Sequence, residues 1–205
     1  MYVEHGGRRP NIHPSAWIAP DAVVSGDVTI GPDTTVLYGA VLTAEAGGRT
    51  EVGSGCVIME QAVLRSSGRF PLYLGNRVLV GPHAYLTGCT VESHSFIATG
   101  AMVFNGARVG EACVVALGGK VHIDTELVAG TRVPIGYIAI GRPATIHPPE
   151  DAPAVHEELA RLDFMRFVFG VDTEGKERAE VMEEALARYS RALQTHRSDS
   201  YPDPA

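Results

Sequence analysis

The chain has 205 residues, 45% of them apolar and 23 of them glycine, a composition that suits one sizeable buried core in a domain rich in turns. Its formal net charge of −7 gives no support to nucleic acid or an anionic membrane surface as a partner. No run of about 20 apolar residues occurs, so no membrane-spanning helix is expected.

The start of the chain and its cysteines bear on location. The first nine residues are polar and do not resemble a signal peptide. The three cysteines are odd in number and lack the spacing of metal ligands, so we expect buried thiols in a reducing compartment. Both features predict a cytoplasmic protein.

From residue 12 to residue 133, aliphatic residues recur at steps of six in four series, and a small residue often follows four positions later. A period of six matches neither an α-helix nor a β-strand, so the repeat itself is the structural unit. Three hexads would make one triangular coil, and 20 hexads predict a mainly β solenoid of six to seven coils within residues 1–146. The four series are Ile12, Ile18, Val24, Ile30, Val36 and Leu42; Val52, Ile58 and Leu64; Leu74, Val80 and Leu86; and Val91, Ile97, Val103, Val109, Val115, Val121, Leu127 and Val133.

Two steps of ten residues interrupt the repeat, between Leu42 and Val52 and between Leu64 and Leu74. Each step holds four residues more than a hexad, which predicts loops at 43–51 and 65–73. Loops on a rigid scaffold are common places for binding and catalytic residues. We therefore look for function at these two loops.

After Pro143 the composition changes. Residues 147–153 are rich in proline, and the following apolar residues have helical spacing, which predicts amphipathic helices at roughly 153–169 and 174–195. Residues 147–197 are expected to form a helical appendage that lies against the solenoid or a neighbouring subunit. The polar tail, 198–205, is expected to be disordered.

Three motifs carry a resemblance to a known family. They are Ala40-Val41-Leu42 before the first loop, Val80-Gly81 leading to Leu86-Thr87-Gly88-Cys89, and the closing Gly141-Arg142-Pro143-Ala144. With these motifs the chain resembles the γ-class carbonic anhydrases over about residues 10 to 146. The resemblance implies a left-handed parallel β-helix and a homotrimer. In that family a Zn or Fe ion, bound by three His between subunits, activates a water that attacks carbon dioxide.

The resemblance places the three ligand His of the family at Arg65, Pro82 and Thr87 of this chain. Arg keeps its proton and Pro has no side-chain donor, so we expect no family-type metal and no other cofactor. The family's Arg-Gly-Asp aligns with Thr43-Ala44-Glu45, which removes its Arg and lengthens its acid. His83, next to Pro82, could replace a lost ligand only if its coil shifted by one residue. The aliphatic side chain of Val80 opposes such a shift because it fixes the register of the coil.

In a retained trimer, these changes would leave an altered cleft between subunits. We expect Arg65, Glu45 and Thr87 to bind a small anionic or acyl substrate, because a guanidinium suits a carboxylate or phosphate. His83 and Glu60 are the catalytic candidates, since only a His titrates near neutral pH without perturbation. A plainer interpretation of Glu60 and Arg65 is an ion pair at an interface.

Two other functions stay open. Many coenzyme A-dependent acyltransferases share the hexapeptide solenoid and use a His in an extended loop, but loops 43–51 and 65–73 contain no His. A non-catalytic scaffold subunit would keep the solenoid for assembly alone. Carbon dioxide hydration is not expected, because lowering the pKa of water to near 7 needs the metal.

Overall fold

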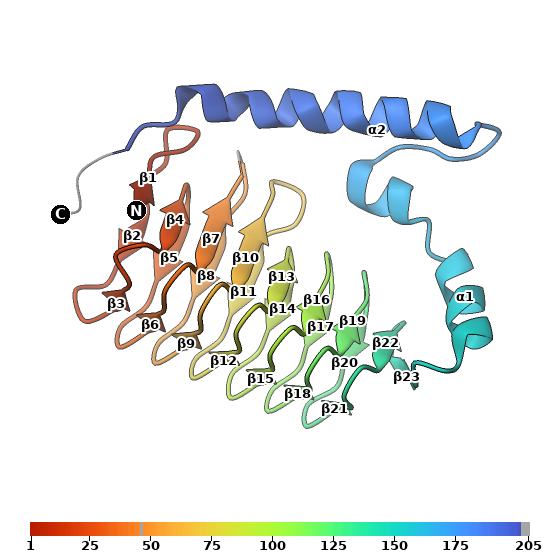
Figure 1. Ribbon diagram of the computed structural model, residues 1–205, viewed down its shortest axis with the longest axis horizontal. Helices are drawn as coiled ribbons and strands as arrows, with labels where there is room; N and C mark the ends of the chain where they lie inside the picture. The colour runs from red at the N-terminus through yellow and green to blue at the C-terminus, as the bar shows by residue number, and fades with distance from the viewer. Residues whose placement is uncertain (46, 202–205) are drawn as a thin grey trace.

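The computed structural model describes residues 1–45 and 47–201. Short parallel strands wind into a left-handed parallel β-helix, which confirms the fold predicted from the repeat (Figure 1). Three strands make one coil, so β2 to β22 form seven coils, preceded by β1. The coils stack into three sheets that form the three sides of the solenoid.

The first sheet has nine strands and faces the C-terminal helices. In spatial order they are β1 (Tyr2–Val3), β4 (Val23–Ser25), β7 (Val41–Ala44), β10 (Val63–Ser66), β13 (Tyr85–Thr87), β16 (Met102–Val103), β19 (Lys120–Val121), β22 (Ile138–Ile140) and β23 (Thr145–His147). All pair in parallel except β23, which pairs with β22 in the antiparallel direction.

The second and third sheets have seven strands each. The second contains β2 (Asn11–Ile12), β5 (Val28–Ile30), β8 (Thr50–Val52), β11 (Leu72–Leu74), β14 (Thr90–Val91), β17 (Arg108–Val109) and β20 (Glu126–Leu127). The third contains β21 (Arg132–Val133), β18 (Val114–Val115), β15 (Phe96–Ile97), β12 (Leu79–Val80), β9 (Val57–Ile58), β6 (Thr35–Val36) and β3 (Trp17–Ile18).

The hexad aliphatics fill the interior in aligned rows. Leu64 pairs in register with Leu42 on one side and Leu86 on the other, and all three side chains are fully buried. The small residues Ala40 and Ala62, also fully buried, fit beside them at the corners. Because neighbouring residues on a strand point to opposite faces, each buried aliphatic fixes its neighbours on the outer surface.

The appendage contains α1 (Ala152–Ala160), the π-helical turn η1 (Met165–Phe169), α2 (Arg178–Leu193) and the 3-10 turn η2 (Gln194–Ser198). The first predicted helix, 153–169, is therefore broken near Asp163. The Asp163 carboxylate accepts hydrogen bonds from the Arg166 amide at 2.9 Å and the Thr173 hydroxyl at 2.9 Å, which starts a new turn. A capping box of Glu177 and Glu180 begins α2.

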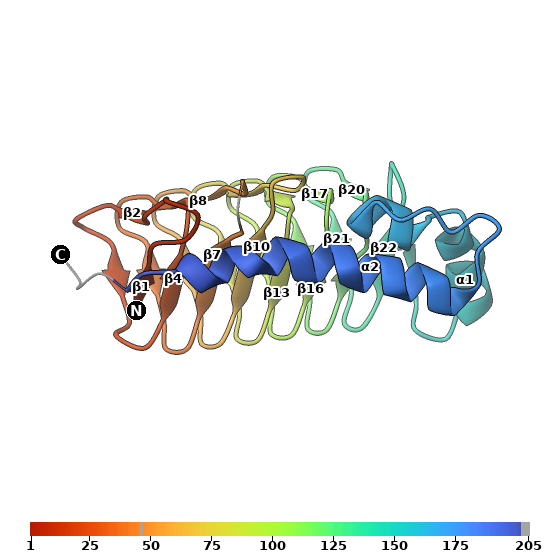
Figure 2. The ribbon, with the colours of Figure 1, turned by 90° about the horizontal axis from the view of Figure 1, so that it is seen from above.

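Helix α2 runs back along the length of the solenoid over the first sheet (Figures 1 and 2). Its inner residues Val181 and Ala185 are buried with Val171 in a small apolar cluster of the appendage. The long helix therefore covers one side of the solenoid, and the second and third sheets face away from it.

The end of the chain is bound to its beginning. Ser200 and Glu4 form an antiparallel bridge with backbone bonds of 2.9 and 3.1 Å, and Asp199 accepts a hydrogen bond from His5. Residues 198–201 thus make defined contacts where a disordered tail is predicted, and the prediction for 202–205 lies outside the described residues. None of the described helices is long and apolar enough to cross a membrane.

Candidate functional site

Arg65 and Thr87 lie side by side on the first sheet. Strands β10 and β13 pair so that Arg65 is opposite Thr87, and Thr43 of β7 is opposite Arg65 on the other side. The adjacent residues Leu64 and Leu86 point inward, so Arg65 and Thr87 point outward, toward α2. Two of the three positions implied by the resemblance are therefore direct neighbours.

A cavity of about 580 Å³ lies between the first sheet and the appendage. The predicted ligand-binding residues Glu45, Arg65 and Thr87 all line it. Most of its other walls are aromatic or apolar. They come from the sheet and loop 65–73 (Ser66, Ser67, Gly68, Arg69, Phe70, Tyr85, Phe104 and Asn105) and from the appendage (Phe164, Val168, Phe169, Tyr189, Ala192, Leu193 and Thr195).

The Arg65 guanidinium is the central charge in this cavity. Its Nη2 atom lies 3.0 Å from Oε1 of Glu45, and its carbon lies 5.6 Å from the ring centre of Tyr189. Burial alone would lower the pKa of Arg65, but the Glu45 carboxylate and Tyr189 outweigh it, and the pKa lies above its ordinary value. Arg65 therefore stays charged, and part of its fork of donors is open to a ligand.

Loop 65–73 supports the cavity from the side. The Arg69 guanidinium lies 5.2 Å from the ring of Phe70 and 5.8 Å from that of Phe167, and it donates to the Arg166 carbonyl at 3.4 Å. Contact with the same loop accounts for the glycine at position 88. Gly88 has a φ of +51°, and a Cβ there would lie 2.3 Å from the Phe70 Cβ. The loop thus anchors the appendage to the solenoid.

Glu60, Pro82 and His83 lie elsewhere, at the corner between the third and first sheets. His83 is exposed with a φ of 56°, and its amide donates to the Glu60 carbonyl at 3.0 Å. Neither Glu60 nor His83 lines the cavity at Arg65. Within one chain, the two catalytic candidates are thus separated from the three ligand-binding candidates.

The side chains at positions 65, 82 and 87 do not fit the family's metal. They provide a guanidinium already paired with Glu45, a proline ring and one hydroxyl. Zinc sites are built from imidazole, thiolate and carboxylate donors, and a cationic guanidinium repels a dication.

Sequence patterns did not identify the aromatic wall of the cavity. The sequence pattern places apolar positions of amphipathic helices at Phe164, Phe169 and Tyr189. Periodicity shows that a helix has an apolar face but not which surface that face packs against. His122 lies half-buried in the outward row that continues from Phe104. Burial lowers its pKa below the ordinary value, so His122 is mainly neutral at pH 7.

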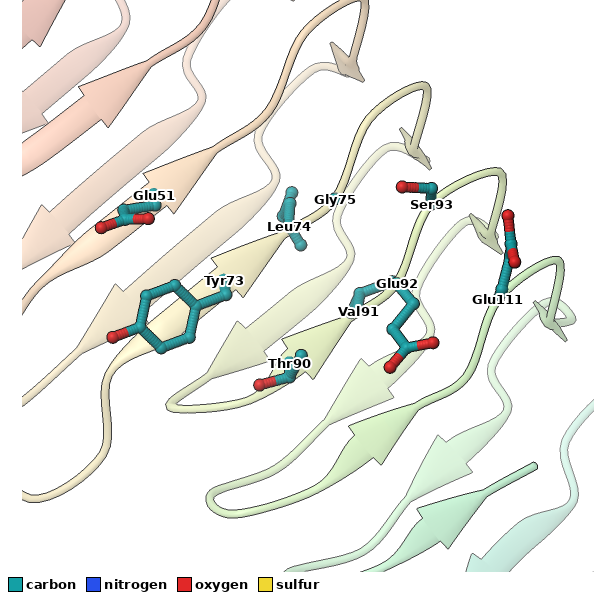
Figure 3. Close-up of a pocket in the computed structure, with 9 residues that line it drawn as sticks. All are labelled: Glu51, Tyr73, Leu74, Gly75, Thr90, Val91, Glu92, Ser93 and Glu111. Atoms are coloured by element: carbon teal, nitrogen blue, oxygen red, sulfur yellow. The ribbon is translucent and has the colours of Figure 1, made fainter. Parts of the chain in front are cut away.

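A second hollow, of about 360 Å³, lies on the second sheet, away from Arg65 (Figure 3). Tyr73 and Thr90 stand on its floor, and the carboxylates of Glu51, Glu92 and Glu111 lie around it. Each carboxylate already has a cationic or imidazole partner, so this hollow offers less free charge than the cavity at Arg65. The partners are Arg49, Arg108 and His94, respectively.

No protein-family profile matches the chain. It is 35% identical over 143 residues to the mitochondrial γ-carbonic anhydrase 1 of Arabidopsis thaliana, covering 67% of this chain and 50% of that protein. The chain thus spans about half the length of this plant relative. It is 28% identical over 146 residues to a carbonic anhydrase of Geobacillus kaustophilus, covering 71% of this chain and 76% of that protein.

The solved structures agree on the fold. A crystal structure of a Bacillus cereus protein, named as a candidate acetyltransferase, has a TM-score of 0.52 and 22% identity, covering 93% of this chain and 96% of that one. At this identity the likeness concerns the fold alone. The sequence relatives and the shared solenoid together place the chain among the hexapeptide-repeat relatives of the γ-class carbonic anhydrases.

Proposed function

We propose that the protein binds a small carboxylate or acyl compound in the cavity at Arg65 and does not hydrate carbon dioxide. The observation that carries the proposal is a charged Arg65 in the wall of a largely aromatic cavity of about 580 Å³. Such a volume suits a small organic ligand, and the guanidinium groups of Arg65 and Arg69 in a wall that is mostly aromatic or apolar suit a ligand with an anionic end.

The geometry indicates how such a ligand would be held. Its carboxylate would accept hydrogen bonds from the Arg65 nitrogens that Glu45 leaves open, with the Thr87 hydroxyl beside it. Its apolar body would pack against Phe104, Phe169 and other rings of the wall. Helix α2 would shield the complex from water, because Tyr189 lies directly over Arg65.

Replacement of Arg65 by Ala is expected to weaken binding of benzoate or hexanoate at least about tenfold, because a hydrogen bond to a charged group contributes about 1.5–3 kcal/mol. Arg65→Lys should fall in between, since an ammonium keeps the charge and loses the planar fork. Titration calorimetry on the full chain measures the affinity.

The control for this experiment is Arg49→Ala, which removes an equal charge from an exposed ion pair with Glu51. It should leave the affinity unchanged. Equal affinity of the Arg65→Ala variant and the unchanged protein would refute a ligand site at Arg65. Absence of binding by all carboxylates and by acetyl coenzyme A would favour the scaffold function, and tight binding of acetyl coenzyme A alone would favour the acyltransferase.

We also propose that three copies associate through the third sheet. Its outward row carries Trp17, Leu79 and Phe96, with 46%, 36% and 38% of their surfaces exposed. Leu79 and Phe96 are direct neighbours, and Trp17 lies further along the same row. An exposed apolar row of this kind is typical of an association surface. The corner with Glu60 and His83 directly follows this sheet, so association here would bring it to a neighbouring copy.

Phe96→Glu is expected to convert the trimer to monomers, because a charge in an apolar interface is left without a partner. Sedimentation velocity measures the change. Tyr73→Glu, on the outer face of the second sheet, is the matched control and should stay trimeric. A trimeric Phe96→Glu variant, or a monomeric unchanged protein, would contradict this interface.

Catalysis would depend on that assembly. If His83 of one copy reaches the cavity of the next, its imidazole can move a proton on the ligand, with Glu60 beside it.

The proposed cytoplasmic location is supported by three free, buried cysteines. Burial raises the pKa of each thiol, and that of Cys89 to about 12. Such thiols are structural rather than reactive.

A further inference from the structure

The N-terminal hairpin and the end of the chain meet beside the cavity. There, His5 and His196 lie with ring centres 4.3 Å apart, and Glu45 and Asp199 complete a compact group. One ligand atom each from His5, Glu45 and His196 can be chosen so that all lie within 4.8 Å of one another. Among the residues that the structure describes, no other group of three such side chains is this close.

Asp199 orients both imidazole rings. Its Oδ1 lies 2.6 Å from Nδ1 of His5, and its Oδ2 lies 2.9 Å from Nδ1 of His196. A carboxylate accepts hydrogen bonds, so it places the ring proton of each His on Nδ1. Loss of the proton from Nε2 would then give each ring a lone pair on that atom, which is the form that binds a metal.

The two Nε2 atoms lack suitable protein donors. Nε2 of His196 lies 3.0 Å from Oε2 of Glu45, and Asp199 and Glu45 together raise the pKa of His196, so without a metal a protonated Nε2 donates to Glu45; a metal ion would take the place of this proton. Nε2 of His5 contacts only the Thr195 hydroxyl, at 3.4 Å, and that hydroxyl already donates to the Ala192 carbonyl at 2.9 Å. His5 is only 2% exposed, so bulk water does not satisfy it.

We infer that Nε2 of His5, Nε2 of His196 and a carboxylate oxygen of Glu45 bind a divalent transition-metal ion, with Zn²⁺ as the best-suited probe. Two imidazoles and a carboxylate are a common zinc donor set, and metal–ligand distances of about 2.0–2.2 Å place neighbouring ligand atoms roughly 3–3.5 Å apart. Nε2 of His196 and Oε2 of Glu45, 3.0 Å apart, have that spacing, and Nε2 of His5 would need to move closer, since the three ligand atoms lie within 4.8 Å of one another.

The surroundings of this group match those of a metal site. Asp199 holds the far side of both imidazoles, and Arg65 holds Oε1 of Glu45 at 3.0 Å while Oε2 faces His196. An outer carboxylate such as Asp199 orients imidazole ligands in metal sites, and the Glu45 carboxylate lies between the Arg65 guanidinium and the position of the ion, which offsets the repulsion of the two positive charges. The ion would lie at the edge of the cavity that Glu45 lines, and it would join the two ends of the chain.

This inference does not require an anion at Arg65, although the two proposed sites share Glu45, and it concerns different residues from the family's three ligand positions. Sequence spacing gives no signal for it, because His5 and His196 are 191 positions apart in the chain. Only the return of α2 along the first sheet brings them together (Figure 1). The appendage therefore contributes a ligand to a site that the solenoid alone lacks.

The test uses the full chain without an affinity tag, stripped with a chelator and titrated with Zn²⁺ alone at about pH 8, because metal binding must displace protons from its ligands. Equilibrium dialysis with metal analysis should give one Zn²⁺ per chain. His196→Ala should weaken Zn²⁺ binding at least about tenfold, and Zn²⁺ should raise the melting temperature of the unchanged protein but not of this variant.

His94→Ala is the matched control, because it removes an exposed His that contacts the single carboxylate Glu111 at 3.2 Å. It should bind Zn²⁺ like the unchanged protein. The inference would be overturned if no Zn²⁺ bound, or if the His196→Ala variant bound Zn²⁺ with equal affinity. The group of His5, His196, Glu45 and Asp199 would then be a set of hydrogen bonds between the two ends of the chain. Benzoate binding by the stripped protein, tested with Arg65→Ala, reports separately on the proposed function.

Discussion

Replacement of Leu64 by Ala is expected to lower the free energy of unfolding by about 3–5 kcal/mol. Leu64 is fully buried and lies in register between Leu42 and Leu86 in the row that fills the solenoid. Its truncation leaves a void that the two stacked neighbours cannot close without shifting their own coils. Urea denaturation followed by circular dichroism measures the loss.

Val63→Ala is the control for Leu64, because Val63 is the preceding residue on the same strand and points outward. It should lower the free energy of unfolding by less than about 1.5 kcal/mol, as it is only partly buried. Equal losses for the two variants would mean that the hexad aliphatics do not form the core. The slope of the denaturation curve should be unchanged in both.

The second large effect is expected at Gly88, where Ala should lower the free energy of unfolding by about 3–4 kcal/mol. Its φ of +51° is unfavourable for any side chain, and the added Cβ would lie 2.3 Å from the Phe70 Cβ. Phe70 packs 5.2 Å from the ring of Phe167, so its displacement would also loosen the appendage. Thermal and urea denaturation measure the change.

Gly100→Ala separates the two contributions at Gly88. Gly100 has a φ of +65°, but no atom lies within 4 Å of the position its Cβ would take. Ala there should lower the free energy of unfolding by about 1–2 kcal/mol, the conformational part alone. If the two variants were equally stable, the contact between Gly88 and loop 65–73 would not contribute.

The repeat predicted the solenoid well because one periodicity determines both the interior and the corners. Leu42, Leu64 and Leu86 lie in separate series, but the same step places them in one row. The ten-residue steps likewise predicted loops, but the second loop is shorter than 65–73, because β10 runs to Ser66 and β11 begins at Leu72; the residues between them anchor the appendage. Local spacing is enough wherever each coil contacts only its neighbours.

The candidate site was predicted only in part, for the same reason. Arg65 and Thr87 are neighbours because of the coil register, which the sequence contains, and Glu45 enters from the adjacent loop. Tyr189 and His196 reach the site through the packing of α2, which depends on contacts between distant segments. Amphipathic spacing shows that such a helix has an apolar face, but it does not show which side of the solenoid that face covers.

The antiparallel strand at one end of the first sheet has a consequence for the behaviour of many copies together. A stack of parallel coils presents the same backbone ladder at its end as in its middle, and a second chain could extend it into a fibre. Because β23 reverses direction against β22, the last ladder of this sheet no longer matches the β1 strand of another molecule. End-to-end addition through this sheet is thereby disfavoured, although the other two sheets end on the parallel strands β20 and β21, and copies remain free to associate through their sides.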